Sequence, residues 1–178
     1  RDGHDENEGG HMFSDQGRGQ HRDQGYGHRG FASIQWGSLY THGIFDLDGT
    51  LADTIGDIAA SMDGALKARG FPLPESGRYP AMVGWGIRRL AFSALPEGAR
   101  DDATVDAVAA DALALYRRNP VVLTRPYPGI PELLAELRRR GLVLAVYTNK
   151  PDPVARLVVD ALFPAGTFAL VRGDVEGR

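Results

Sequence analysis

Short apolar runs separated by polar turns predict strands from residue 39 onward. The first strand is predicted at about residues 42–46, where Ile44 and Phe45 lead directly into Asp46. Residues 142–147 form a continuous apolar run, as expected for a central parallel strand. A third strand is predicted at residues 167–171. Long segments separate these runs, so the strands must be joined by crossovers, which favours a parallel sheet.

Apolar residues recur at helical spacing between and after these runs. Ile58, Met62 and Leu66 share one face of a helix that Asp53 or Thr54 can cap. Further helices are predicted at residues 87–95, 101–118, 131–140 and 152–162. No strand is predicted between the first three helices, which indicates a helical bundle inserted after the first strand.

This order of elements predicts an α/β fold with a Rossmann-like parallel sheet. Residues 39–53 and 125–178 are expected to form the α/β core, and residues 54–124 the helical insertion. Residues 1–38 are rich in Gly, His, Asp, Gln and Arg and have almost no apolar periodicity, which predicts a disordered extension. Its histidines leave a metal-binding tail as an alternative, although they lack a spacing that would focus a metal site: His4, His11, His21 and His28.

Composition excludes several classes of function. The 178-residue chain has a net charge of −3, which gives no broad basic surface for nucleic acid. It has no cysteine, so disulfides, thiol catalysis and Cys-based zinc sites are excluded. No run approaches the ~18 apolar residues of a membrane span, and the polar start is not a secretory signal. We therefore expect a cytoplasmic protein with neither nucleic acid nor membrane as a partner; its oligomeric state cannot be predicted.

Two aspartates at the end of the first strand are the main candidates for chemistry. Asp46 and Asp48 lie where open α/β sheets bind ligands, and Gly49 permits a tight turn beside them. One carboxylate can act as a nucleophile, and the other as an acid and then a base. Two carboxylates this close repel each other, which predicts Mg²⁺ as a cofactor. An acidic turn is the alternative; a calcium loop fits worse, because its sixth position would be Leu51.

A second candidate motif follows the apolar run at residues 142–147. Thr148 and Asn149 offer a hydroxyl and an amide at the end of a buried strand. The next helix begins immediately afterwards and adds backbone donors at its N-terminus. Such groups can hydrogen-bond phosphate oxygens, although this pattern alone specifies no substrate; a small phosphorylated substrate is what the family resemblance described next implies.

The sequence Asp46-Leu47-Asp48-Gly49-Thr50-Leu51 resembles motif I of the haloacid dehalogenase superfamily, in its phosphatase branch. Residues 127–150 resemble the segment of phosphoglycolate phosphatases that carries motif II, with Thr148 as the phosphate-binding residue. The resemblance implies a core with a helical cap, an Asp46 nucleophile and an Asp48 acid–base. It implies that Thr50, Thr148 and Asn149 bind the phosphoryl group, and that Asp46 and Asp48 hold Mg²⁺.

The implied activity is hydrolysis of a phosphomonoester through an aspartyl-phosphate, with 2-phosphoglycolate as substrate. Other small phosphoesters, pyrophosphate and a sugar-phosphate mutase reaction stay open, as does a non-catalytic or degenerate relative. Dehalogenation and phosphonate hydrolysis are disfavoured, because Asp48 retains the acid that those branches lack.

The resemblance also exposes a departure. The family requires a motif III lysine and then acidic motif IV, and neither is found before Arg178; Asp174 is not the motif IV acid, because motif III should come first. We expect an incomplete core, an exposed apolar edge at the first strand, poor activity and a tendency to aggregate.

The predicted cap carries a second point of resemblance. Val83-Gly84-Trp85-Gly86 and Leu90 look like the Val-Gly-x-Gly…Leu segment of the phosphoglycolate phosphatase cap. Arg88 or Arg89 could there meet a substrate carboxylate. The alternative is that Trp85 belongs to the cap core and that both arginines are solvated.

Overall fold

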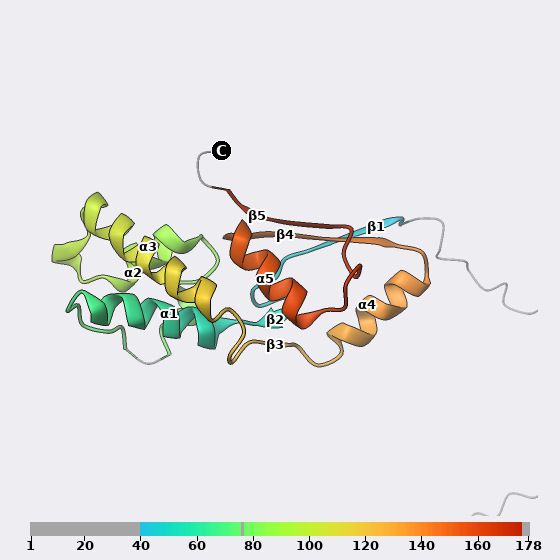
Figure 1. Ribbon diagram of the computed structural model, residues 1–178, viewed down its shortest axis with the longest axis horizontal. Helices are drawn as coiled ribbons and strands as arrows, with labels where there is room; N and C mark the ends of the chain where they lie inside the picture. Colours follow the sequence, from blue (N-terminus) through green and yellow to red (C-terminus); the bar gives the residue numbers. More distant parts are fainter. Residues whose placement is uncertain (1–39, 76, 176–178) are drawn as a thin grey trace, which may run out of the picture. The chain divides into compact units, whose positions relative to one another are not determined.

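The computed structural model describes residues 40–75 and 77–175, and the predicted extension at residues 1–38 lies outside them. Three parallel strands form the main sheet in the order β1-β4-β5 (Figure 1). Their bounds are β1, His42–Phe45; β4, Val143–Pro151; and β5, Leu170–Asp174. The chain therefore has the α/β fold that its hydrophobic pattern predicts.

Two helices cover one face of this sheet. They are α4, Ile130–Arg139, and α5, Asp152–Leu162 (Figure 1). Alternate side chains of β4, such as Leu144 and Val146, are buried on the covered face. Val154 and Val158 of α5 are likewise buried, so the core of this layer lies between α5 and strands β4 and β5.

The opposite face of the sheet, called here the open face, carries exposed apolar side chains, and no described helix covers it (Figure 1). Ile44 pairs in register with Ala145, which pairs with Leu170, so the three form one row across the strands. The most exposed members of this face are Ile44 at 73%, Tyr147 at 67%, Leu170 at 55% and Val143 at 45%. In the described chain β1 is also an edge strand, which confirms the predicted apolar edge.

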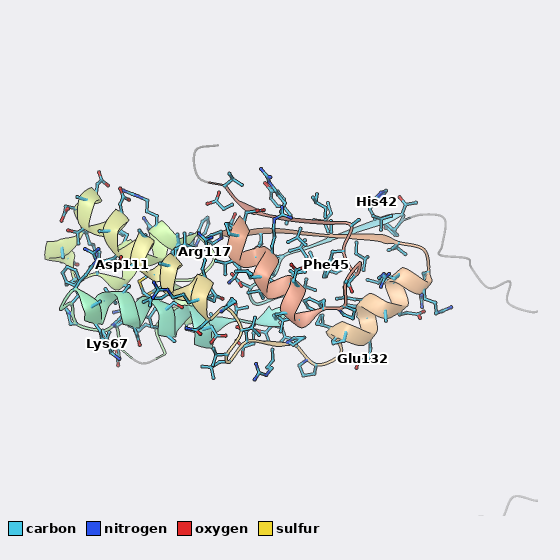
Figure 2. All side chains as sticks on the ribbon, in the orientation of Figure 1. His42, Phe45, Lys67, Asp111, Arg117 and Glu132 are labelled. Atoms are coloured by element: carbon cyan, nitrogen blue, oxygen red, sulfur yellow. The ribbon has the colours of Figure 1, made fainter. Side chains whose placement is uncertain are left out.

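Three helices follow the motif I turn, and two short 3₁₀ turns separate them. Their bounds are α1, Ile55–Ala68; α2, Ile87–Ala94; and α3, Asp102–Arg118. Helix α3 packs on both α1 and α2, and the buried side chains of α1 and α3 share the predicted helical spacing: Ile58, Met62, Leu66, Val105, Val108 and Ala112. At the surface, Arg69 pairs with Asp111 of α3, and Figure 2 labels Asp111. Trp85 is 79% exposed, so its predicted alternative place in the cap core is wrong.

A second, two-stranded sheet joins the two ends of this helical insertion. Strand β2, Ala52–Asp53, pairs antiparallel with β3, Arg125–Pro126. Sequence patterns predict only a stiff segment at residues 125–131, because two-residue strands carry no periodicity. This β2–β3 pairing brings the start and the end of the insertion together beside the motif I turn.

Two predicted strands have different bounds in the structure. Strand β4 continues past Tyr147 to Pro151, because its end still pairs with β5 after an irregularity between these two residues. Strand β5 begins three residues later than predicted, because Thr167 closes a turn instead, with its N–H and hydroxyl both donating to the Pro164 carbonyl. Within the described ranges, no helix combines the length and apolar character that crossing a membrane requires.

Candidate active site

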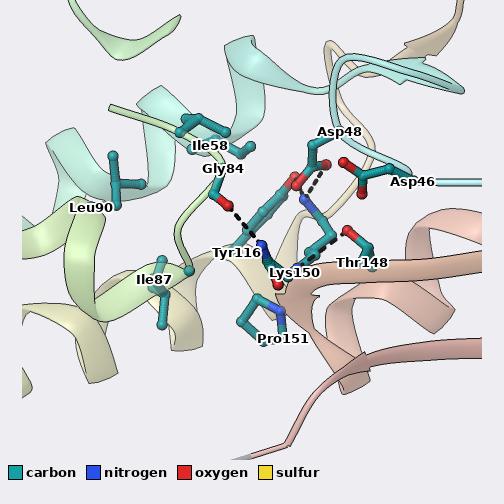
Figure 3. A pocket seen from close by; sticks show the side chains of 13 residues that line it. Asp46, Asp48, Ile58, Gly84, Ile87, Leu90, Tyr116, Thr148, Lys150 and Pro151 are labelled. Carbon is teal, nitrogen blue, oxygen red and sulfur yellow. Dashed lines mark hydrogen bonds and ion pairs between the residues drawn. The ribbon is translucent and has the colours of Figure 1, made fainter. Parts of the chain in front are cut away.

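A small pocket of about 60 Å³ lies where the carboxyl ends of β1 and β4 meet the helical insertion (Figure 3). The sheet side contributes Asp46 and Asp48 after β1, and Thr148, Asn149 and Lys150 from β4. The insertion contributes mainly apolar walls: Ile58, Val83, Ile87, Leu90 and Tyr116. The pocket thus joins one polar wall to one apolar wall.

The turn after β1 fixes the two aspartates in the pocket wall. The Asp46 side chain accepts a hydrogen bond from the Leu47 N–H at 2.7 Å. The Leu47 carbonyl in turn accepts from the Ala52 N–H at 3.1 Å, which closes the turn. Gly49 has a φ of 75°, in the left-handed region that glycine tolerates. The Asp-x-Asp-Gly spacing therefore places both carboxylates at the same strand end.

Asp48 is anchored through a single oxygen. Its Oδ1 accepts from the Thr54 hydroxyl at 2.8 Å and from the Lys150 ammonium at 2.8 Å. Thr54 begins α1 but makes no side-chain cap, because its hydroxyl is directed to Asp48 instead. No described residue donates to Oδ2 of Asp48, so this oxygen is available to a ligand.

Lys150 directly follows Thr148 and Asn149 in the motif II segment and adds a charged side chain to this site. The Lys150-Pro151 pair looks like the Lys-Pro pair of motif III but belongs to motif II. The Lys150 side chain is 1% exposed, and its Nζ contacts Asp48 and also the Tyr116 hydroxyl at 2.7 Å (Figure 3). The same nitrogen lies 4.4 Å from the Tyr116 ring centroid, in cation–π range. Burial lowers the pKa of Lys150, and the nearby Asp48 charge counteracts part of that shift.

Burial also keeps Tyr116 in its protonated form. It raises the pKa of this phenol, and the negative charges of Asp48 and Asp57 raise it further. A neutral hydroxyl can accept a hydrogen bond from the Lys150 ammonium. Tyr116 belongs to α3, so this contact joins the insertion to the sheet.

The predicted phosphate-binding residues are only partly brought together. Thr148 is buried in the pocket wall, and its hydroxyl accepts from the Lys150 N–H at 3.3 Å. Asn149 also lines the pocket and donates from its side chain to the Gly84 carbonyl at 2.9 Å (Figure 3). Thr50 is exposed and is not among the lining residues. The structure thus gathers four of the five predicted site residues: Asp46, Asp48, Thr148 and Asn149.

The two arginines considered for a substrate carboxylate lie elsewhere. Arg88 pairs with Asp102 and Asp106 on α3. Arg89 stacks over the Phe92 ring at 5.3 Å. Neither lines the pocket, so Lys150 is its one cationic side chain among the described residues.

A buried carboxylate beside the site holds the returning chain. Asp57, 3% exposed in the first turn of α1, accepts hydrogen bonds from the N–H groups of Val122, Leu123 and Thr124. The Thr124 hydroxyl adds a bond of 2.6 Å. Burial favours the protonated form of Asp57, but these hydrogen bonds outweigh it and hold the pKa of this carboxyl below its ordinary value. Sequence patterns do not single out Asp57, because its partners are distant in sequence.

The acidic pair suits Mg²⁺ better than a metal that needs several protein ligands. Among residues 40–75 and 77–175, no three His, Asp or Glu side chains gather to hold an ion. Mg²⁺ instead keeps several waters and is bound through one or two carboxylates together with substrate phosphate. Asp46 and Asp48, side by side in a pocket wall, fit that donor set.

The chain belongs to the haloacid dehalogenase-like hydrolases, since the model of that family matches residues 42–177. It is 36% identical over 136 residues to a phosphoglycolate phosphatase of Aquifex aeolicus, which covers 76% of this chain and 62% of the relative. It is also 36% identical over 119 residues to an N-acetylmuramic acid 6-phosphate phosphatase of Pseudomonas aeruginosa, covering 67% and 52%.

Solved structures share the fold. A crystal structure of a predicted phosphoglycolate phosphatase from Haemophilus somnus matches with a TM-score of 0.67 at 26% identity, covering 75% of this chain and 62% of that one. The chain thus spans between half and two thirds of the length of the relatives that it matches. These relatives are named as phosphatases, and the chain is similar to them over most of its own length.

Proposed function

We propose that this chain carries the nucleophile and phosphate-binding parts of a Mg²⁺-dependent phosphomonoester hydrolase, with 2-phosphoglycolate as substrate. The observation that supports this most is the convergence of Asp46, Asp48 and Thr148 on one pocket. These residues come from two paired strands, β1 and β4, and the pairing sets their separation. The substrate assignment rests on the phosphoglycolate phosphatase relatives, and the cytoplasmic location stays a prediction.

In the proposed reaction, a carboxylate oxygen of Asp46 attacks phosphorus, and the bond from phosphorus to the ester oxygen breaks. Asp48 gives a proton to that leaving oxygen, which departs as an alcohol. Asp48 then takes a proton from water as the water attacks phosphorus, which releases phosphate and restores Asp46. The Thr148 hydroxyl and the Asn149 amide orient the phosphoryl oxygens. Asp46 and Asp48 would hold Mg²⁺, which would supply positive charge near the phosphoryl oxygens when bound.

The insertion contacts the strand end directly, because the Asn149 side chain donates a hydrogen bond to the Gly84 carbonyl. The choice of substrate rests on the relatives, among which a phosphoglycolate phosphatase and an N-acetylmuramic acid 6-phosphate phosphatase are equally identical to this chain.

The test is hydrolysis of 2-phosphoglycolate by the purified chain with Mg²⁺, beside Asp46→Asn, which keeps the shape but loses the nucleophile. We expect slow turnover that chelation of Mg²⁺ and Asp46→Asn each abolish. Acid quenching during turnover should trap a phosphate bound to Asp46, which mass spectrometry can locate. A folded sample that neither turns over nor becomes phosphorylated would favour the alternative of a non-catalytic relative.

A further inference from the structure

We propose that Lys150, held by Tyr116, binds a second anionic group of the substrate, a carboxylate one carbon away from the ester oxygen. This binding position is called here the carboxylate seat. The inference rests on the proposed function, and it names the residue that selects the substrate. It starts from the charges in the pocket: two aspartates line it, and Lys150 is the one cationic side chain among the described residues that does so. A doubly anionic substrate entering beside two carboxylates needs such a partner.

The position of Lys150 places it beyond the phosphoryl site. Thr148 and Lys150 are alternate residues of β4, and both are buried on the same side of the strand. The Lys150 ammonium lies 2.8 Å from Asp48 Oδ1 and 2.7 Å from the Tyr116 hydroxyl of the insertion. Asp48 is the residue proposed to protonate the leaving oxygen, so the ammonium lies on the leaving-group side of the phosphoryl group, toward the insertion.

The contacts of Lys150 leave capacity for that anion. An ammonium has three donors, and described residues use two of them, through Asp48 Oδ1 and the Tyr116 hydroxyl. The Tyr116 ring, with its centroid 4.4 Å away, further restricts the nitrogen. A buried, restrained lysine beside a cavity is organised for a ligand before the ligand arrives.

The alternative is that Lys150 serves only the aspartates, as a neutralising charge. The two roles separate when the far end of the substrate is changed and the phosphoryl end is kept. 2-Phosphoglycolate and 2-hydroxyethyl phosphate have the same chain length, but the second carries a neutral hydroxyl where the first has a carboxylate. A carboxylate seat discriminates between them, whereas a neutralising charge acts on both alike.

The experiment measures the ratio of kcat/KM for these two esters with Mg²⁺. For the original chain we expect a preference of about 10–100-fold for 2-phosphoglycolate, as one buried charge-assisted hydrogen bond would give. Lys150→Met should bring the ratio near one. Tyr116→Phe, which keeps the ring and removes only the hydroxyl, should reduce it by about threefold or more. Arg88→Met removes a cap cation that pairs with Asp102 and Asp106 outside the pocket, and should leave the ratio unchanged.

Binding separates failure of this inference from failure of the proposed function. Calorimetric titration of both esters into Asp46→Asn, with and without Lys150→Met, tests the seat without turnover. If 2-phosphoglycolate binds selectively through Lys150 but the chain hydrolyses neither ester, carboxylate binding by Lys150 is supported and the proposed hydrolase activity is contradicted. Hydrolysis without preference for the carboxylate, or an equal loss for both esters in Lys150→Met, overturns the seat and leaves the hydrolase. If Lys150→Met does not fold, as shown by circular dichroism, the ratio in Tyr116→Phe decides.

Discussion

The carboxylate of Asp57 and the backbone N–H of Thr124 are joined by a hydrogen bond of 2.8 Å, although 67 positions separate them in the chain. The bond fastens the first turn of α1 to the segment through which the chain returns to the sheet. Because Asp57 is 3% exposed and serves several donors at once, its loss would leave them without this acceptor, including the buried N–H of Thr124.

We therefore expect Asp57→Asn to lower the free energy of unfolding by about 2–4 kcal/mol. The neutral amide replaces a charged acceptor, and its NH₂ group would face backbone N–H groups that also donate. Urea denaturation followed by circular dichroism measures this loss. Asp111→Asn is the matched control: it removes a carboxylate of α3 that is 43% exposed and pairs with Arg69, and should cost no more than about 1 kcal/mol. Equal effects of the two variants would contradict a special role for Asp57.

The contribution of Asp57 should also depend on pH. The pKa of Asp57 is lowered in the folded chain, so as the pH falls the unfolded chain binds this proton before the folded chain does. The stability that this group contributes is therefore complete above the ordinary carboxyl pKa of about 4. That stability is lost as the pH falls through the lower folded value. The difference in unfolding free energy between the original chain and Asp57→Asn should be constant from pH 7 to about pH 5 and should shrink below about pH 4. A difference that does not change with pH would show that the carboxyl is not perturbed.

Thr148 and Thr50 should differ in their effect on catalysis. Thr148 is buried in the pocket wall, whereas Thr50 is exposed and outside it. Thr148→Val should lower kcat/KM for 2-phosphoglycolate by about 10–100-fold, because it removes one hydroxyl donor to a charged phosphoryl group. Thr50→Val should change it by less than about threefold. The reverse order would place the phosphoryl group nearer to Thr50.

The row of apolar side chains on the open face should drive self-association. Ile44, 73% exposed on an edge strand, is its most exposed member. Sedimentation velocity over a range of concentrations should show larger species for the original chain and fewer for Ile44→Lys. Leu133→Lys, at an exposed apolar position of α4, is the control and should leave the distribution unchanged. A chain that stays monomeric throughout this range would rule out association through this face.

Gly173 should tolerate no side chain. A Cβ at this position would collide with the Lys150 carbonyl oxygen and would lie 2.5 Å from the Asp152 Cα, so backbone would have to move. Gly173→Ala should cost about 1–3 kcal/mol in chemical denaturation, as overpacking does. Gly98→Ala, where nothing lies within 4 Å, should change stability by less than about 0.5 kcal/mol. A Gly173→Ala protein as stable as the original would show that β5 shifts without strain.

Local patterns were enough to predict the layers of the fold and the main acidic pair. The apolar run before Asp46 and the glycine after Asp48 define a strand and a turn from neighbouring residues alone. The exposed edge at β1 also followed, from the resemblance to the family.

The contacts between distant segments could not be predicted in the same way. Lys150 reaches Asp48 across 102 positions, and its contact with Tyr116 depends on how α3 packs against the strand end. Trp85 is large and apolar but exposed. The sequence could not predict this, because hydrophobicity alone does not say which side of a loop faces the core. The later start of β5 depends on a turn at Thr167 that residue periodicity does not reveal.

The β2–β3 ribbon gives the helical insertion a shared entrance and exit. Ala52 and Pro126 are register partners, so the polypeptide leaves the sheet layer and returns to it at the same place, the β2–β3 pair. The cost of closing such a detour grows only slowly with its length, by roughly 0.6 kcal/mol per doubling. Changes of length within the insertion can therefore leave the register of β1 on β4 in place, provided that Tyr116 and Gly84 keep their contacts with β4.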